Sequence, residues 1–476
     1  MQIPEKGLSK EQVLGTLQAF KSHDMDWKAG KVWCYVYNPS EDTTDVVKQA
    51  YMLYLTENGL DPTVFPSLLK LETDVVRMLA TLLRGDENVV GHLTTGGTES
   101  IMLAVKTARD RARALHPEIA QPEMVLPKTA HASFHKAAHY LDIKPVLVDI
   151  NPTTFKVETE AMRAAINKNT ILLVASAPSY SQGVIDPIAE IGALAQEKGL
   201  LFHVDGCVGG IHLSFMRKLG YKVPDFDFSV PGVTSISADL HKYGYAAKGA
   251  SCVMYSNKDI RKYQIFACTD TTAYTLINPT VTSSKSGGPM AGAWAILNYL
   301  GEEGFKNIVK TVQESTQKLI EGVNAIPELE VLGQPAMCMF SFKSDAINVY
   351  QLADAMAKRG WYVQGQFSTP LTPRNLHISV TYGTARQADA LLEDLRECVD
   401  EVKHADPIDS DGIRAMVSAA LGSPDPEAAL GQLAQAAGIG GADLPEQMAF
   451  INEVLDALPN EVANALLINY FNDLYV

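Results

Sequence analysis

A lysine near the middle of the chain is the first residue whose setting indicates chemistry. Lys242 follows His241 in SISADLHKYGYAAKG, where a β-branched segment gives way to a short loop that contains glycine. A lysine that bonds to an aldehyde must first lose its proton, and partial burial near other cations lowers the lysine pKa towards that state. The alternative is a solvated surface amine, which the dipeptide alone does not exclude. Lys242 is therefore a candidate nucleophile.

A pair of glycines predicts a phosphate site. Gly96 and Gly97 stand in TTGGTES, directly before an amphipathic segment that begins near Ile101. Glycines let a phosphate approach the backbone, and the start of a helix offers unpaired N–H groups and a partial positive charge. The alternative is an ordinary helix cap, made by the hydroxyl of Thr95 or Thr98.

Two further polar residues lie in positions where a cofactor could be held. Asp205 ends GLLFHVDG, where a buried parallel strand would run out into a loop, and ligands bind beyond the carboxyl ends of such strands. A carboxylate there can pair with a protonated pyridine nitrogen, although a turn or helix cap is the alternative. His131, in PKTAHASFHKA, could lie flat on an aromatic ring and relay protons, or be a surface or core histidine. The order of glycine loop, histidine, aspartate and lysine on successive units strengthens all four interpretations.

The elements that must position these residues indicate an α/β fold. Between residues 91 and 300, short β-branched runs such as TILLVASA alternate with helical patterns such as IAEIGALAQEKG, which predicts a large domain with a mainly parallel, doubly covered sheet. Residues 1–90 predict an N-terminal arm and a first long helix, and residues 301–404 a smaller α+β domain. Residues 405–476 predict a partly ordered appendage, rich in turn-forming residues at first and then helical.

Composition narrows the possible partners. The chain has 476 residues and a formal net charge of −15, which repels nucleic acid and anionic membrane surfaces. Its six cysteines show no CxxC spacing, so neither a zinc site nor a disulfide framework is expected. No apolar run reaches the roughly 18 residues of a membrane span. We therefore expect a cytoplasmic protein without a membrane anchor.

Several long stretches resemble one known family. TTGGTESIMLA, AHASFHKAA, FHVDGCVGG and PGVTSISADLHKYGYAAKGASCVMYS are similar to segments of the sphingosine-1-phosphate lyases, a group within the pyridoxal-dependent decarboxylase family. The resemblance runs over roughly residues 30 to 404. It implies the aspartate-aminotransferase-like fold, called fold type I, the cofactor pyridoxal 5′-phosphate, and a homodimer whose active sites lie across the interface.

The resemblance also implies a role for each candidate residue. Lys242 would carry the cofactor in Schiff-base linkage, Asp205 would bind its pyridinium and His131 would stack on its ring. Lys248 would help to receive the substrate phosphate. The cofactor phosphate would be held by residues of both subunits, namely Gly97, Thr98 and His241 of one and Ser284 and Gly287 of the other.

Three positions depart from the family pattern. Trp33 stands where the family usually has tyrosine, Asp61 where it has histidine, and Lys285 where it has arginine. The first two family residues face the substrate phosphate, and the carboxylate of Asp61 would repel the group that histidine attracts. Tyr35 or Tyr37 could supply the missing hydroxyl.

Three functions follow as hypotheses. The leading one is cleavage of the C2–C3 bond in a long-chain 2-amino-3-hydroxy phosphate, giving a fatty aldehyde and phosphoethanolamine. The second is decarboxylation of an L-amino acid, which needs a cation for a substrate carboxylate. Arg374 is a candidate for that cation, although a surface loop cation is the alternative. The third, a catalytically idle scaffold, is disfavoured because Lys242, Asp205 and His131 are all present.

Overall fold

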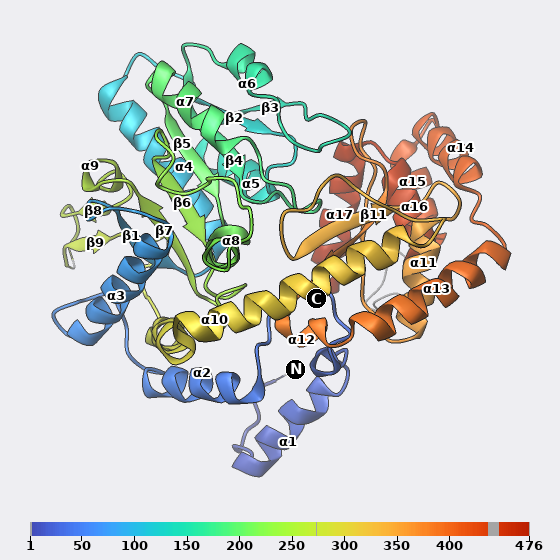
Figure 1. The fold of residues 1–476 in the computed structure, drawn as a ribbon, viewed down its shortest axis with the longest axis horizontal. Coiled ribbons are helices and arrows are strands. Elements are labelled where there is room, and N and C mark those ends of the chain that lie inside the picture. Colours follow the sequence, from blue (N-terminus) through green and yellow to red (C-terminus); the bar gives the residue numbers. More distant parts are fainter. Residues whose placement is uncertain (1, 273, 437–446, 476) are drawn as a thin grey trace.

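A seven-stranded sheet forms the body of the protein (Figure 1). The computed structural model describes residues 2–272, 274–436 and 447–475. The strand order is β1-β7-β6-β5-β4-β2-β3, and β7 runs in the direction opposite to the other six strands. The mainly parallel sheet predicted from the sequence is thus confirmed. The strands are β1 (Val90–Thr94), β2 (Glu123–Pro127), β3 (Lys144–Val148), β4 (Thr170–Ser176), β5 (Leu201–Asp205), β6 (Ser235–Ala238) and β7 (Ser251–Tyr255).

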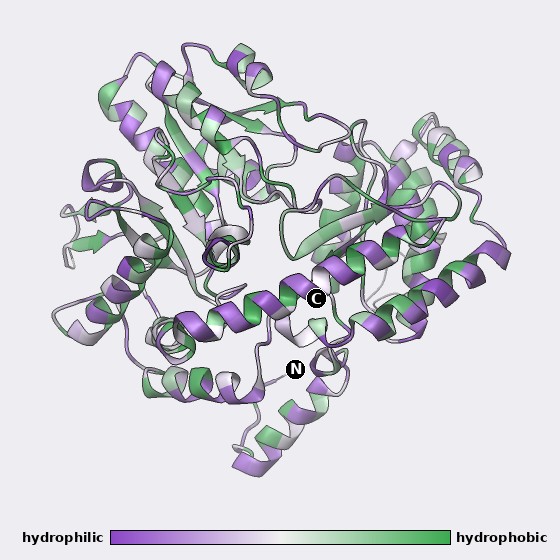
Figure 2. Cartoon of the chain, in the orientation of Figure 1, coloured by the Kyte–Doolittle hydropathy of each residue, from purple (hydrophilic) through white to green (hydrophobic). Residues whose placement is uncertain are grey.

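Helices cover both faces of this sheet, so its central strands β4 and β5 are buried along their whole length and are mainly apolar (Figure 2). Successive side chains of a strand point to opposite faces. Leu172 and Val174 of β4 therefore join a core with α4 and α5, whereas Leu173 and Ala175 join the larger core with α7 and α8. The helices of this region are α4 (Gly97–Leu115), α5 (Ala132–Leu141), α6 (Thr159–Ala165), α7 (Ile188–Lys198), α8 (Gly209–Lys218) and α9 (Lys258–Arg261).

The first helix of the N-terminal arm, α1, projects away from the body (Figure 1). Helix α1 (Lys10–Lys21) has no buried residue. It exposes an apolar stripe of Val13, Leu14, Leu17 and Phe20 at helical spacing. The arm continues through a short 3₁₀ turn (Trp27–Ala29), α2 (Glu41–Leu53) and α3 (Pro66–Leu82), of which α2 and α3 pack against α10.

A smaller antiparallel sheet follows in the chain. Its strand order is β10-β11-β13-β12, and α10 passes beneath both sheets (Figure 1). Helix α10 (Gly287–Asn324) is broken at Gly301, where φ is 56°, beside the boundary expected at residue 300. The remaining elements are β8 (Phe266–Cys268), β9 (Leu276–Asn278), β10 (Glu330–Val331), β11 (Met339–Lys343), α11 (Val349–Lys358), β12 (Gln364–Gln366), β13 (Asn375–Ser379), α12 (Tyr382–Ala385) and α13 (Ala388–His404).

The C-terminal appendage is more helical than its composition suggested. It contains α14 (Ser410–Leu421), α15 (Pro426–Ala436), α16 (Ala449–Ala457) and α17 (Asn460–Leu474). Helix α15 occupies a stretch that was expected to be rich in turns, because proline is tolerated in the first turn and the following alanines and leucines favour helix. The rest of that stretch, residues 437–446, lies outside the described residues. Residues 405–476 carry eleven acidic side chains against one basic side chain.

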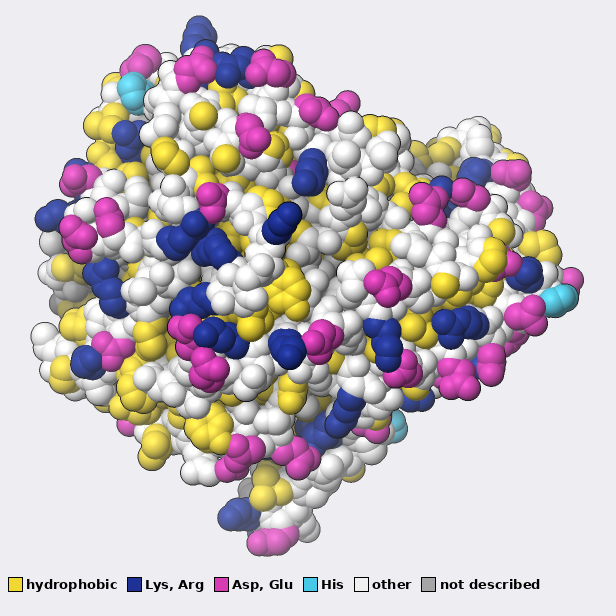
Figure 3. Space-filling view, in the orientation of Figure 1, with side chains coloured by type: hydrophobic (Ala, Val, Ile, Leu, Met, Phe, Trp, Pro, Cys, Tyr) yellow, Lys and Arg dark blue, Asp and Glu magenta, His cyan; other side chains and the backbone are white. Residues whose placement is uncertain are grey.

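The surface carries both signs of charge. On the face in Figure 3, acidic and basic side chains are interspersed with apolar ones. Among the helices that the structure describes, none has the length and apolarity needed to cross a bilayer. All six cysteines are free thiols, as the sequence predicted.

Candidate active site

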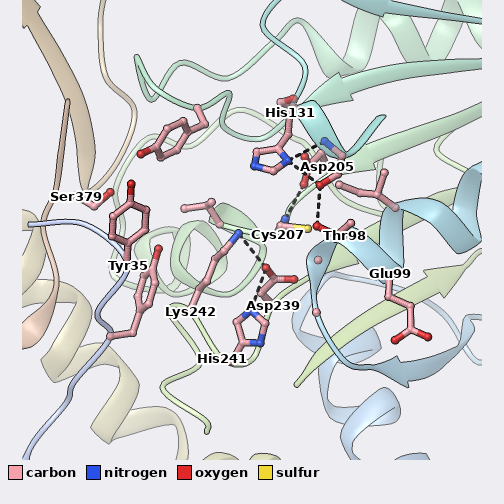
Figure 4. A pocket seen from close by; sticks show the side chains of 18 of the residues that line it. Tyr35, Thr98, Glu99, His131, Asp205, Cys207, Asp239, His241, Lys242 and Ser379 are labelled. Carbon is pink, nitrogen blue, oxygen red and sulfur yellow. Dashed lines mark hydrogen bonds and ion pairs between the residues drawn. The ribbon is translucent and has the colours of Figure 1, made fainter. Parts of the chain in front are cut away.

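The four candidate residues from separate α/β units meet around one cavity. Lys242, His131, Asp205 and Gly97 line a space of about 700 Å³ (Figure 4). The lysine lies in the loop between β6 and β7, and the aspartate ends β5. The cavity thus opens at the carboxyl edge of the parallel strands, where α/β folds bind ligands.

Lys242 is held by a carboxylate that the sequence analysis missed. Its Nζ lies 2.9 Å from Oδ2 of Asp239, whose side chain is almost fully buried. Ser251 donates a hydrogen bond of 2.5 Å to the other oxygen of Asp239. The signal was available in SADLHK, because an aspartate three residues before a lysine can fold back onto it within one tight loop.

The ion pair with Asp239 shifts the pKa of Lys242 upward, whereas the sequence analysis expected a lowered pKa. Burial alone opposes the charged ammonium, but the carboxylate of Asp239 outweighs it and holds the pKa of Lys242 above its usual value. Burial likewise raises the pKa of Asp239, and the charge of Lys242 reverses that effect, so its pKa is lowered. In this state both groups are therefore ionised at neutral pH.

The start of α4 is free for an anion. Gly96 is its N-cap residue, and no side chain caps it, so the proposed cap by Thr95 or Thr98 is not formed. Thr95 instead donates from N and Oγ1 to Glu99, at 2.6 and 2.7 Å. A Cβ on Gly97 would lie 2.7 Å from the carboxylate of Asp239, so only glycine fits there. The first N–H groups of α4 thus point to the cavity without a side-chain partner.

His131 is fixed in one tautomer by the backbone. As the N-cap of α5, its Nδ1 accepts a 3.2 Å hydrogen bond from the backbone N–H of Ser133. That nitrogen therefore carries no proton, and the neutral ring holds its proton on Nε2. Burial lowers the pKa of His131, which favours the same neutral form. The hydroxyl of Ser133 also lies 2.8 Å from that of Thr98, which ties the histidine to the start of α4 (Figure 4).

Asp205 is oriented by its own loop. Its Oδ1 accepts hydrogen bonds from the backbone N–H of Cys207 at 3.0 Å and the hydroxyl of Ser237 at 3.3 Å. These two donors fix the direction of the carboxylate. The structure therefore presents a carboxylate to the cavity beside His131, as a site for a protonated ring nitrogen requires.

A second lysine stands at the same cavity. Nζ of Lys248 donates to the backbone oxygens of Tyr35 and His241, at 3.1 and 3.4 Å, and lies 4.8 Å from the ring centre of Tyr37. No carboxylate of the described residues lies within ion-pair distance of it. Burial and the charge of Lys242 lower the pKa of Lys248. The ring of His241 is neutral, because burial lowers its pKa to about 4.

Trp33 does not reach the cavity, which corrects its assignment to substrate binding. It is fully buried and packs against Trp361 at a ring distance of 6.5 Å. Tyr35 and Tyr37 line the cavity in its place. Tyr35 has a φ of 63°, so the chain turns at this residue, which lies between Trp33 and Tyr37.

Three other predicted residues lie away from the cavity of their own chain. Asp61 is exposed and accepts hydrogen bonds from N and Oγ1 of Thr63, at 2.8 and 2.6 Å. Ser284 is exposed beside Asn58, and the N–H of Gly287 is bonded within the N-terminal region. None of the three residues therefore contributes to the Lys242 cavity of its own chain.

Comparison with known proteins gives the family. The family model for the pyridoxal-dependent decarboxylase conserved domain matches residues 4–345. The chain is 41% identical over 432 residues to the sphingosine-1-phosphate lyase of Arabidopsis thaliana, covering 89% of this chain and 78% of the relative. The chain belongs to the sphingosine-1-phosphate lyases, within the pyridoxal-dependent decarboxylase family. It is therefore a pyridoxal 5′-phosphate enzyme, as its sequence suggested.

Three further matches are a solved structure, a decarboxylase and a second family model. The structure of a sphingosine-1-phosphate lyase from Burkholderia pseudomallei superposes with a TM-score of 0.81 at 36% identity, covering 89% of this chain and 96% of that one. A probable L-aspartate decarboxylase from Pyrococcus furiosus is 31% identical over 361 residues, 76% of this chain and 94% of the relative. A model described as a putative C-terminal HTH domain of pyridoxal-dependent enzymes matches residues 412–473.

The residues present fit the cofactor. An uncapped helix start can take a phosphate, an oriented carboxylate can take a pyridinium, and a neutral imidazole can lie on a ring. A reactive lysine lies between them in a cavity of about 700 Å³.

Proposed function

We propose that this enzyme cleaves the C2–C3 bond of a phosphorylated long-chain 2-amino-3-hydroxy base, giving a fatty aldehyde and phosphoethanolamine. The observation that carries the proposal is the pairing of Lys242 and Lys248 at one cavity, with Lys248 free of any carboxylate in the described structure. A cation held only by backbone oxygens can bind a phosphate without first giving up a partner. The identity to sphingosine-1-phosphate lyases supports the same substrate class.

The lining of the cavity supports the cofactor contacts that the family resemblance implies. Lys242 would bond to the cofactor, Asp205 would hold its ring nitrogen and His131 would cover its ring. The cofactor phosphate would lie at the start of α4, on Gly97 and Thr98, with His241 beside it. When bound, pyridoxal phosphate supplies an electron sink for the pair of the breaking bond.

The side chains account for one of the two proton transfers. As the C2–C3 bond breaks, a base removes the proton of the C3 hydroxyl, whose oxygen becomes the aldehyde oxygen, and C2 must gain a proton. When Lys242 is not bonded to the cofactor, Asp239 at 2.9 Å keeps its Nζ protonated as an ammonium. It is therefore the side chain placed to deliver a proton to C2.

The alternative function, decarboxylation of an amino acid, needs a cation for the substrate carboxylate, and Arg374 does not provide it. Its guanidinium forms an ion pair with Glu453, lies over the ring of Tyr350 and does not line the Lys242 cavity. A substrate carboxylate would have to displace a buried carboxylate to reach it.

We also propose that the active enzyme is a cytoplasmic homodimer with shared sites. The apolar stripe of α1 has no cover in the single chain, and Ser284 and Gly287 lie outside its own cavity. The six free thiols fit a reducing compartment.

The test is to incubate the cofactor-loaded enzyme in parallel with sphinganine 1-phosphate and with a panel of L-amino acids. We expect hexadecanal and phosphoethanolamine from the first and no carbon dioxide from the second, both followed by mass spectrometry. Carbon dioxide with an amine, and no aldehyde, would replace the lyase with the decarboxylase.

A further inference from the structure

Glu99 is a buried acidic residue of the TTGGTES motif to which the proposed cofactor contacts give no role. It is only 8% exposed. Its Oε2 accepts hydrogen bonds from the backbone N–H and the hydroxyl of Thr95, at 2.6 and 2.7 Å. Its Oε1 accepts a 2.7 Å hydrogen bond from the backbone N–H of Val281, which lies 182 residues later in the chain. One side chain therefore joins two loops that are distant in the sequence.

The first of these loops, residues 95–98, is the phosphate loop, at which the cofactor phosphate is proposed to lie. Glu99 stands three residues after Gly96, the N-cap residue of α4, and a glutamate at this position reaches back to the backbone before the helix. Because Glu99 accepts from both donors of Thr95, that hydroxyl does not cap α4. The side chain of Glu99 points away from Lys242 (Figure 4). It therefore holds the phosphate loop from the side opposite to the lysine.

The second loop connects β9 to α10 and carries Ser284. Val281 in this loop is 60% exposed, so its position depends on the backbone bond to Glu99 rather than on packing of its side chain. At the other end of the loop, Nζ of Lys285 lies 2.5 Å from Oε1 of Glu72. Ser284 lies between these two anchors. Loss of the bond to Glu99 would release the loop on one side of Ser284.

A small cavity separates the two loops. It has a volume of about 80 Å³ and is lined by Thr280 and Thr282 of the second loop. Thr95 and Glu99 line it as well, and both also line the Lys242 cavity. Among the residues that the structure describes, Glu99 is the one carboxylate at this small cavity. It is therefore the acceptor that the two loops share.

We propose that Glu99 is a positioning residue that sets the cofactor phosphate sites of both subunits. Its Oε2 holds the phosphate loop of its own subunit, and its Oε1 holds the loop that brings Ser284 to the site of the partner subunit. The assignment rests on the proposed cofactor contacts and shared active sites, and it does not depend on which substrate bond breaks. It also fixes the sign of an effect. A glutamate that acted only through its charge would repel the phosphate, so removing the charge would tighten cofactor binding, whereas loss of positioning weakens it.

Binding of two forms of the cofactor tests the assignment. Cofactor-free enzyme is titrated with pyridoxal 5′-phosphate and with pyridoxal, which lacks the phosphate, and absorbance gives the Kd of each. Glu99→Gln keeps the length of the side chain but leaves one acceptor oxygen for two loops. We expect it to raise the Kd of pyridoxal 5′-phosphate by about tenfold or more and to change that of pyridoxal by less than about twofold. A general defect in folding would weaken both. Glu190→Gln, an exposed glutamate in the first turn of α7, is the matched control and should change neither.

Two further variants separate position from charge. Glu99→Asp keeps the charge but is one methylene shorter, so it cannot reach both loops and should also weaken binding of pyridoxal 5′-phosphate. Ser284→Ala should raise the Kd of pyridoxal 5′-phosphate by about tenfold in the wild type, because it removes a hydrogen bond to a charged group. In Glu99→Gln the same change should cost less than about twofold, because the loop has already lost its anchor.

The possible failures are distinguishable. If the wild type binds pyridoxal 5′-phosphate no more tightly than pyridoxal, the proposed phosphate site falls and the role of Glu99 falls with it. If Ser284→Ala leaves the Kd unchanged in the wild type, the shared sites fall, and the role of Glu99 in both subunits with them. If both of these results are as expected, three outcomes overturn the role of Glu99 alone. They are tighter or unchanged binding of pyridoxal 5′-phosphate in Glu99→Gln, an equal loss of pyridoxal, and the same cost of Ser284→Ala with and without Glu99.

Discussion

At the scale of single residues, the pair of Lys242 and Asp239 decides the protonation state of the site. A buried lysine alone would lose its proton easily, which was the expectation from the sequence. The carboxylate at 2.9 Å reverses this and keeps the free lysine as an ammonium. The ion pair keeps a proton on Lys242 for delivery to C2. Because a protonated lysine cannot attack the cofactor aldehyde, the same ion pair slows formation of the bond between Lys242 and the cofactor.

We expect Asp239→Asn to speed cofactor loading at neutral pH. Without the carboxylate, burial lowers the pKa of Lys242, and each unit of lowering raises the free amine about tenfold. Loading of the cofactor-free wild type should accelerate as pH rises through neutrality, and the variant should load faster at pH 7 with a weaker pH dependence. The rise of cofactor absorbance after mixing measures this. The exposed Asp259→Asn is the control, and an unchanged pH dependence in Asp239→Asn would contradict the role of the pair.

Lys248 should govern substrate affinity more than turnover. A hydrogen bond to a charged group contributes about 1.5–3 kcal/mol, so Lys248→Gln should raise KM for the phosphorylated substrate by about tenfold to a hundredfold. The value of kcat should fall much less. Lys248→Arg, which keeps the charge, should recover part of the affinity, and steady-state kinetics on the three proteins would show it. A loss confined to kcat would mean that Lys248 does not bind the phosphate.

At the scale of elements, motifs in loops after strands could be predicted from the sequence, whereas partners across the fold could not. Asp205, His131 and Lys242 each follow an apolar strand, and the order of strands in an α/β sheet brings such loops together. The position of Trp33 depends on a bridge between Val32 and Tyr362, more than 300 residues later. A shift of two residues in that pairing exchanges the buried ring for Tyr35, and no local pattern fixes it.

The docking of α16 is a second feature that sequence could not predict. Arg374 was a candidate for a substrate carboxylate, yet its partner is Glu453 in the appendage. We expect Glu453→Gln to destabilise the protein by about 1–3 kcal/mol, because the guanidinium stays partly buried without its counter-charge. Glu461→Gln, the same change at an exposed position of α17, should have little effect. Thermal unfolding compares the two, and equal midpoints would show that the pair contributes nothing.

At the scale of the whole molecule, shared active sites can be tested by mixing. Lys242→Ala removes the cofactor lysine, and Ser284→Glu, at a surface position, places a carboxylate where the partner's cofactor phosphate would lie. Each variant should be nearly inactive. After exchange of subunits at equal amounts, half of the dimers would be mixed and would hold one intact site, so activity should recover to about a quarter of wild type. No recovery after proven exchange would mean that each chain builds its own site.

The C-terminal helices match a model described as a putative HTH domain, but their charge argues against DNA as a ligand. Residues 405–476 contain eleven acidic residues and one basic residue, whereas binding to the DNA phosphate backbone requires an excess of basic residues. We expect the intact enzyme to leave a labelled duplex unshifted in a gel at 50 mM salt. A shifted band would show that the match to this family model extends to DNA binding.

The docking of the C-terminal helices separates two parts of the enzyme that can change independently. Loops of the large sheet carry the ion pair of Lys242 and Asp239, while the loop after β12 is fastened to Asp456 of α16, near the other end of the sequence. Exchanging C-terminal segments between relatives should therefore alter that loop without disturbing the protonation of Lys242.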